Sequence, residues 1–255
     1  MRPPEDLAEE LHSRQADMAV PVIDLSDIQK DKRRKEIIEE VRLASGKWGF
    51  FQVVNHEIPL GIFDEMINGV RLFNEQDLEV KKKFYSRDLT RKVRFNSNYD
   101  LYSSRFANWR DTLTISMPDH LDPEELPATC SCHYYPACPD PELTLGASKH
   151  TDPGMVTLLL QSQICSLQVL QDGQWVNVQP IPGSLVINMG DILKIISNDK
   201  FKSVEHKVIA NRDGPRISVA CFFTGSIFTP LRTYSPIKEL TSEYDPVQNN
   251  PYLNN

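Results

Sequence analysis

The chain has 255 residues, of which 40% are hydrophobic, and it carries a net charge of −7 with 18 Pro and 11 Gly. This length allows one large domain or two small ones with a sizeable core, and the composition excludes a disordered chain. The negative charge argues against a nucleic-acid partner, because there is no broad positive field. No apolar run approaches the roughly 18 residues of a membrane span, and no secretory signal is visible, so we expect a cytoplasmic protein.

The first 130 residues mix strand and helix signals. Strands are predicted at residues 20–25, 48–54 and 111–116, and helices at residues 28–46 and 59–84. Ser26 and Gln29 have the spacing of a capping box before the first helix, and Gly46 is expected to end it. His56 is interpreted as a turn residue because no other ligand lies at a useful spacing. Strand and helix alternate here as in a small α/β lobe, followed by a loop at residues 119–127.

The second half contains short strands separated by Gly and Pro turns. Strands are predicted at residues 155–160, 167–170, 174–178, 184–189, 206–210 and 216–223. Asp172-Gly173 is a strong two-residue hairpin signal. Strands of this length at this spacing indicate a sandwich or jelly roll, and residues after 229 are irregular.

The five cysteines are odd in number and match no zinc framework. We expect reduced thiols, as in a cytosolic protein. Cys130 and Cys132 are two residues apart, but without further ligands nearby they are expected neither to bind a metal nor to cross-link.

His150 and Asp152 stand two residues apart, so in an extended segment their side chains lie on the same face. His206 follows far enough along the chain to arrive from another strand. Two imidazoles and one carboxylate on one side of a metal leave the opposite positions open, as in non-haem Fe(II) oxygenases. Each residue alone has a structural explanation, but the order and the spacing favour a metal site.

Arg216 and Ser218 repeat the two-residue spacing ten residues after His206. They place a guanidinium and a hydroxyl on one face, which suits a carboxylate. A buried guanidinium is costly unless an anion pairs with it.

Five segments together resemble the plant 2-oxoglutarate/Fe(II)-dependent dioxygenases, and among these the 1-aminocyclopropane-1-carboxylate oxidase homologs. The segments are residues 48–56, residues 133–139, His150 to Asp152, His206, and Arg216 to Ser218. The resemblance extends over residues 20–229. It implies a mainly β fold, with a double-stranded β-helix (jelly-roll) core after a helix-rich α/β N-terminal region. We expect an N-terminal dioxygenase region at 1–129, the jelly-roll core at 130–230 and an irregular tail at 231–255.

The same resemblance implies that His150, Asp152 and His206 bind Fe(II). It implies that Arg216 and Ser218 bond the far carboxylate of 2-oxoglutarate, with Tyr135 also on this co-substrate. Oxygen is the other co-substrate, and ascorbate is expected to support turnover. The expected reaction is hydroxylation, desaturation or demethylation of a small plant metabolite, with release of succinate and carbon dioxide. The sequence does not identify the substrate or the oligomeric state.

The chain also departs from the family. Cys130 leads directly into His133 and Tyr134, where family members have some tens of residues that form helices outside the barrel. The tail lacks the helix that commonly covers the active site, Cys165-Ser166 replaces a Gly pair, and His133 stands where many members have Asn. We therefore expect a shortened product that exposes an apolar barrel face.

Three other functions remain open. The first is a truncated jelly-roll protein that binds metal with little or no turnover. The second is a zinc hydrolase, which the absence of an obvious general base disfavours. The third, oxidation of 1-aminocyclopropane-1-carboxylate itself, is disfavoured because the motifs are nearer to those of the homologs.

Overall fold

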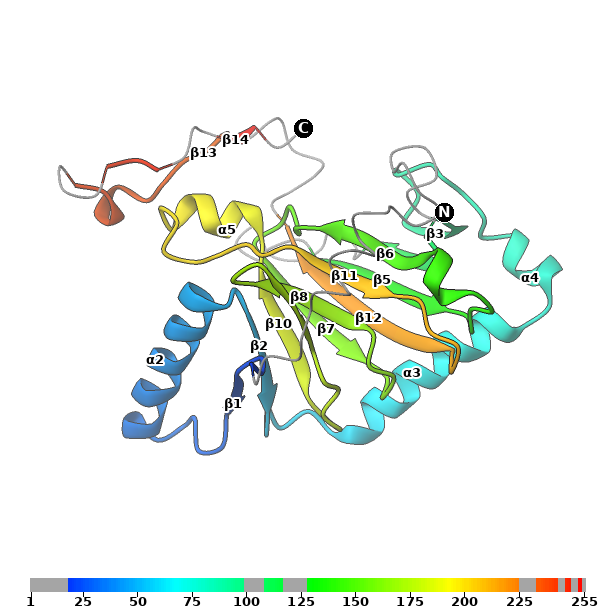
Figure 1. Cartoon of the computed structure of the whole chain (residues 1–255), viewed down its shortest axis with the longest axis horizontal. Helices are drawn as coiled ribbons and strands as arrows, with labels where there is room; N and C mark the ends of the chain where they lie inside the picture. Colours follow the sequence, from blue (N-terminus) through cyan, green and yellow to red (C-terminus); the bar gives the residue numbers. More distant parts are fainter. Residues whose placement is uncertain are drawn as a thin grey trace.

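The computed structural model describes residues 18–98, 108–116, 128–224, 233–242, 246–248 and 252–253 (Figure 1). The large sheet of this part of the chain contains β1 (Val22–Asp24), β2 (Phe50–Val54), β3 (Val93–Ser97), β4 (Asp111–Ser116), β5 (Ala128–Tyr135), β7 (Val156–Gln161), β10 (Leu185–Met189) and β12 (Arg216–Phe223). Their order in the sheet is β1-β2-β10-β7-β12-β5-β4-β3. Strands from both halves of the sequence therefore share one sheet.

The small sheet contains β6 (Leu145–His150), β8 (Leu167–Gln171), β9 (Gln174–Asn177) and β11 (His206–Ile209), in the order β6-β11-β8-β9. The helices are α2 (Asp31–Lys47), α3 (Leu60–Glu75), α4 (Leu78–Lys82) and α5 (Asp191–Ile196), with 3-10 turns at Pro141–Leu143 and Lys238–Leu240. A short pair, β13 (Thr233–Tyr234) and β14 (Tyr252–Leu253), follows near the end. The mainly β jelly-roll prediction is confirmed.

Two hydrophobic clusters hold these layers together. One lies between the two sheets and includes Phe50, Val169 and Val186. The other lies between the outer face of the large sheet and the helices, and includes Phe63 and Ile217. Burial of each such side chain stabilises the folded state by about 1.5–3 kcal/mol. Each face of the large sheet is therefore packed against its own hydrophobic core.

Most of the predicted strands form where their β-branched and apolar runs indicate. The hairpin between β8 and β9 has positive φ at Asp172 (49°) and Gly173 (78°), as a tight two-residue hairpin turn requires. His56 lies in the irregular segment between β2 and α3, where its Nε2 is 2.9 Å from the carbonyl oxygen of Gly183. The predicted loop at 119–127 lies outside the described residues.

The helix boundaries differ from the prediction. Ser26 does not cap α2, because the N-cap position is Lys30; the backbone N–H and the hydroxyl of Ser26 both donate to the Asp24 carboxylate. The helix begins at Asp31 and continues past Gly46 to Lys47. The chain turns at Gly49 instead, where φ is +64° and a Cβ would lie 2.3 Å from the Lys202 carbonyl oxygen.

The single helix predicted at 59–84 is two helices, α3 and α4. Asp77 separates them and accepts a hydrogen bond from the backbone N–H of Glu79, which starts α4. A strong local cap therefore overrides a hydrophobic pattern that runs through both segments. Among the described residues, neither these helices nor the others combine the length and apolar character needed to cross a membrane.

The outer face of the large sheet is covered unevenly. Figure 1 shows α2 beside β1 and β2, and α3 beneath β12 and β5, with β10 and β7 between them. A cross-strand row of half-buried side chains crosses this face: Ile187, Leu158, Cys221, Cys130 and Ile115. These side chains are thus partly rather than fully exposed.

Cys130 has a neighbour that its sequence context does not reveal. All five cysteines are free thiols, but Cys221 on β12 lies directly opposite Cys130 on β5, with their sulfur atoms 3.8 Å apart. The thiols are free, as expected, although strand pairing brings the distant thiol of Cys221 beside Cys130.

Candidate metal and co-substrate site

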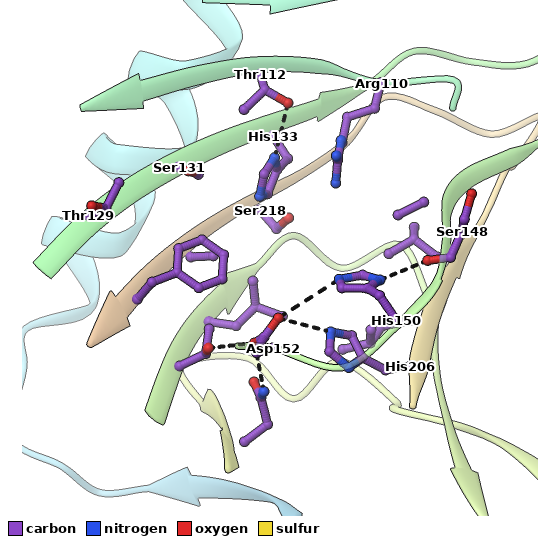
Figure 2. A pocket seen from close by; sticks show the side chains of 18 of the residues that line it. Arg110, Thr112, Thr129, Ser131, His133, Ser148, His150, Asp152, His206 and Ser218 are labelled. Atoms are coloured by element: carbon purple, nitrogen blue, oxygen red, sulfur yellow. Dashed lines mark hydrogen bonds and ion pairs between the residues drawn. The ribbon is translucent and has the colours of Figure 1, made fainter. Parts of the chain in front are cut away.

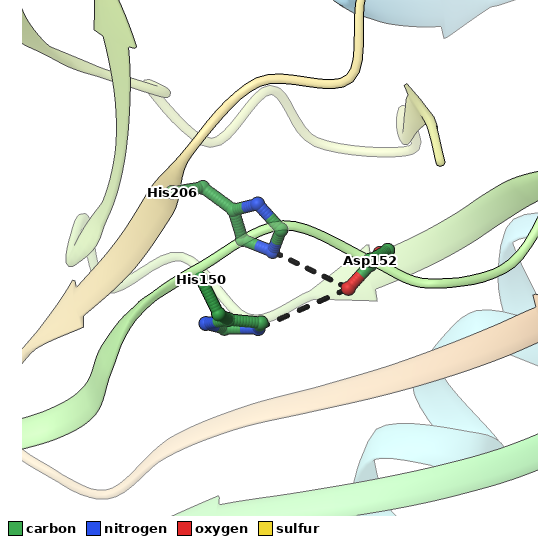
Figure 3. A group of neighbouring side chains, drawn as sticks. All are labelled: His150, Asp152 and His206. Atoms are coloured by element: carbon green, nitrogen blue, oxygen red, sulfur yellow. Dashed lines mark ion pairs between the residues drawn. The ribbon is translucent and has the colours of Figure 1, made fainter. Parts of the chain in front are cut away.

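The three predicted metal ligands meet at one end of the small sheet (Figure 3). His150 ends β6, Asp152 follows it, and His206 begins β11, where it pairs across the strands with His150. The Nε2 atoms of His150 and His206 lie 3.8 and 3.6 Å from Oδ1 of Asp152. One ligand atom from each residue falls within a group no wider than 4.8 Å. The spacing argument therefore predicts the geometry correctly.

Both imidazoles present the correct nitrogen to a metal. Nδ1 of His150 lies 2.7 Å from the Ser148 carbonyl oxygen, and Nδ1 of His206 lies 3.2 Å from that of Val204. A carbonyl oxygen can only accept, so Nδ1 carries the hydrogen and Nε2 keeps its lone pair in the neutral ring. Metal-binding histidines are commonly oriented in this way.

The Asp152 carboxylate is held so that only one oxygen faces the histidines. Its Oδ2 accepts hydrogen bonds from the Thr157 hydroxyl and from the side-chain amide of Asn188, the latter at 2.8 Å. Its Oδ1 is left for the histidine side. With the two nitrogens, this gives the mixed nitrogen and oxygen donor set that suits Fe(II).

Burial and charge set the protonation of this group. Burial alone would raise the pKa of Asp152, but His206, Asn188 and Thr157 outweigh it and the net pKa lies below the usual value. Burial lowers the pKa of His206 to about 4, with His150 adding to the effect. At neutral pH the site therefore offers a carboxylate and neutral imidazole, the forms that bind metals.

A close backbone contact fixes the loop that carries Asp152. Gly190 donates its N–H to the Met155 carbonyl, and Asp191 donates to the carbonyl of Asp152, both at 2.8 Å. A Cβ at Gly190 would lie 2.2 Å from the Gly154 carbonyl oxygen. Glycine is therefore required where the end of β10 meets this loop.

Arg216 and Ser218 lie together, as predicted, on the inner face of β12. Both are almost fully buried. One terminal nitrogen of Arg216 donates to the Ser218 hydroxyl at 3.1 Å, and the other donates to Gln161 at 3.0 Å, while its Nε has no partner. The guanidinium carbon lies 5.0 Å from the centre of the Tyr135 ring. The three predicted co-substrate residues are thus adjacent.

The metal cluster and the Arg216 group line the same cavity, which has a volume of about 540 Å³. Figure 2 shows His150, His206 and Asp152 on one side of the cavity. Thr112, His133 and Arg110 lie on the other side. His133 is buried, and burial lowers its pKa well below the usual value, with Arg110 and Arg216 contributing. A neutral imidazole is therefore part of the cavity wall.

Several residues that hold the site were not predicted from the sequence. Asn188 and Thr157 orient Asp152, Gln161 bonds Arg216, and Arg94 and Arg110 line the cavity. Asn188 had a usable signal, because it is a polar residue inside the otherwise apolar strand β10. The others depend on strand pairings that local sequence does not show.

Comparisons with known proteins define the class to which this fold and site belong. The family model described as the 2OG-Fe(II) oxygenase superfamily matches residues 127–225, and one described as non-haem dioxygenase in morphine synthesis N-terminal matches residues 20–140. The structure of JOX2 in complex with 2OG, Fe and JA superposes with a TM-score of 0.81 and 27% identity, covering 98% of this chain and 90% of that one. That of dioxygenase for auxin oxidation 1 from Arabidopsis thaliana with 2-oxoglutarate has a TM-score of 0.72 and 23% identity, covering 89% and 99%, and supports the fold alone.

Curated relatives narrow the class. 1-aminocyclopropane-1-carboxylate oxidase homolog 1 from Arabidopsis thaliana is 45% identical over 96% of this chain and 80% of its own length. A homolog from Solanum lycopersicum is 43% identical over 96% and 80%. The chain belongs to the 1-aminocyclopropane-1-carboxylate oxidase homologs, a group of 2-oxoglutarate-dependent dioxygenases. Its cofactors are Fe(II) and 2-oxoglutarate, and the cluster of His150, Asp152 and His206 fits the Fe(II) site.

The relatives also contain residues that this chain lacks. The alignment with homolog 1 extends over 290 positions, whereas this chain has 255 residues, so at least 35 positions of the alignment have no counterpart here. This difference agrees with the expectation of a shortened chain.

Proposed function

We propose that this chain hydroxylates, desaturates or demethylates a small organic metabolite, with Fe(II) held by His150, Asp152 and His206. When bound, Fe(II) supplies the centre at which oxygen and 2-oxoglutarate react, with succinate and carbon dioxide as co-products. The supporting observation is the convergence of the three ligand atoms, with both Nδ1 atoms committed to carbonyl oxygens. JOX2, at 27% identity, was crystallised with 2OG, Fe and JA, which supports a small organic substrate here.

The co-substrate is proposed to lie between this cluster and Arg216. The buried guanidinium and the Ser218 hydroxyl would receive the far carboxylate, because they are adjacent and the Nε of Arg216 lacks a partner. Tyr135 would limit the movement of the guanidinium by packing its ring against it. Burial of these groups excludes water, which strengthens the charge interaction.

Succinate release tests the proposal. The purified chain is incubated with Fe(II), 2-oxoglutarate, oxygen and ascorbate, and succinate is measured. Uncoupled turnover is expected even without the organic substrate. Asp152→Ala should abolish succinate release, whereas Asp140→Ala, which changes an exposed carboxylate distant from the cluster, should not. Equal release by the parent and by Asp152→Ala would contradict the assignment.

A second candidate function is metal binding with little or no turnover. It is favoured by the positions missing relative to the homologs and by the half-buried row on the outer sheet face. Calorimetric binding of Mn(II) and 2-oxoglutarate without any succinate release with Fe(II) would support this candidate. A zinc hydrolase is disfavoured, because Asp152 is the one carboxylate among the described residues lining the cavity and it already faces both histidines.

A further inference from the structure

The formal charges of Fe(II), 2-oxoglutarate, Asp152 and Arg216 sum to zero in the proposed centre. The two positive charges of Fe(II) and that of Arg216 offset the two negative charges of 2-oxoglutarate and that of Asp152. Besides Arg216, the described cavity lining contains one other buried cation, Arg94, and no second carboxylate. With metal and co-substrate bound, the guanidinium of Arg94 would therefore remain positive, and it would attract an anion.

Arg94 is buried in this lining. Its residue is 7% exposed, although it belongs to β3 near the edge of the large sheet. One terminal nitrogen donates to the backbone carbonyls of Leu89 and Arg91 at 3.4 and 3.2 Å, and its buried Nε has no partner. Arg94 forms no ion pair with a carboxylate among the described residues, and the nearby Asp88 carboxylate is exposed and bonded to Thr90. A guanidinium buried in this way is costly unless an anion compensates it.

Strand register places a second unpaired polar group beside Arg94. Arg94 on β3 pairs with Thr114 on β4, and Thr114 pairs with Ser131 on β5. All three line the cavity, and the Thr114 hydroxyl is buried with no hydrogen-bond partner. An N–H and an O–H thus stand on one cross-strand row, which are the donors that a carboxylate accepts.

The neighbouring cross-strand row includes part of the proposed 2-oxoglutarate anchor. It contains Thr112, His133 and Ser218, the last of which contacts Arg216. The Arg94 row is therefore separate from the 2-oxoglutarate anchor, although both belong to the inner face of the same sheet.

We propose that the organic substrate of this enzyme is an acid, whose carboxylate is bound by Arg94 and Thr114. This inference rests on the proposed function, since it names the class of substrate that the same cavity takes. Arg94 and Thr114 are specificity-determining residues here, and they position the substrate through its charged end rather than at the oxidised carbon.

Binding of matched ligand pairs tests the inference without turnover. The full chain is loaded with Mn(II) and saturating 2-oxoglutarate, and a panel of aryl- and alkyl-carboxylates is compared with the corresponding primary amides by calorimetry and ligand-observed NMR. Carboxylates are expected to bind about ten- to a hundredfold more tightly than their amides, as charge-assisted hydrogen bonds allow. Arg94→Gln should remove this preference, and so should Thr114→Val in part, while Arg91→Gln, which changes an exposed arginine in the preceding loop, should retain it.

The threonine variant guards against a folding artefact. Thr114→Val keeps the shape of the side chain and removes a hydroxyl that has no partner, so its melting temperature should stay near that of the parent. Carboxylates that bind no better than amides, or no binding by any carboxylate, would overturn the inference. Failure of the proposed function is seen separately, as absence of Mn(II) or 2-oxoglutarate binding in the first titration, and the carboxylate preference of Arg94 can then still be measured on the unloaded chain.

Discussion

Replacing Asn188 with leucine should weaken metal binding without changing a metal ligand. Asn188 is 3% exposed, and its amide donates to Oδ2 of Asp152 at 2.8 Å, beside the Thr157 hydroxyl. Asn188→Leu leaves that oxygen with one of its two donors, so the carboxylate is freer to rotate away from the histidines. A hydrogen bond to a charged group contributes about 1.5–3 kcal/mol, and loss of a partner behind a metal ligand costs about 10- to 100-fold in affinity. The two figures agree, because a tenfold change corresponds to about 1.4 kcal/mol.

The assay is calorimetric titration of Mn(II) into the parent and the variant at one pH. The matched control is Asn177→Leu, which changes an exposed amide on β9 that bonds to Gln168. Cooperative thermal melting of the metal-free variant shows that the fold survives. An affinity for Mn(II) that falls by less than about twofold in Asn188→Leu would refute the role given to this amide.

Three further predictions concern the co-substrate anchor, acid stability and the thiols. Arg216→Lys removes the forked donor, so the affinity for 2-oxoglutarate should fall by about 30-fold or more by calorimetry while Mn(II) affinity is retained. Burial depresses the pKa of His133 from the usual 6.5, so its contribution to stability is complete above pH 6.5 and is lost as pH falls below it, by about 1.4 kcal/mol per pH unit. In urea titrations below pH 6.5, the unfolding free energy of His133→Asn should therefore decline less steeply with falling pH than that of the parent. Identical slopes for the two proteins would contradict this. Hydrogen peroxide should join Cys130 to Cys221, two thiols and one peroxide giving one disulfide and two waters, because their sulfur atoms are 3.8 Å apart. Cys132 raises the pKa of Cys130 to about 11, so cross-linking should be faster at high pH. If non-reducing peptide maps show no disulfide between Cys130 and Cys221 after oxidation, the proposed pairing is contradicted.

Local sequence predicted the features that depend on local chemistry. Runs of apolar residues bounded by Gly and Pro predicted most strands, and Asp172-Gly173 predicted the hairpin because its backbone favours positive φ. The two-residue spacings of His150 with Asp152 and of Arg216 with Ser218 predicted shared faces, since both pairs lie in or beside extended strands. The roles given to these residues remain proposals.

Features that depend on competition or on distant pairing were not predicted. Ser26 matched a capping pattern, but α2 begins only at Asp31, and the hydroxyl of Ser26 donates to the Asp24 carboxylate. Arg94 lies in a segment without a recognisable motif, and only its pairing with Thr114 across β3 and β4 places it in the cavity. Cys130 and Cys221 are likewise brought together only by the pairing of β5 with β12.

The connection between β4 and β5 has a consequence for how this fold tolerates change. The two strands are antiparallel neighbours in the large sheet, so the chain between Ser116 and Ala128 needs only to reverse direction. The entropy of closing such a connection depends weakly on its length. Insertions and deletions can therefore change the length of this segment without shifting the register of any strand. The histidines are carried by β6 and β11 of the opposite sheet, so a lineage can vary the length of this connection while the metal cluster stays in place.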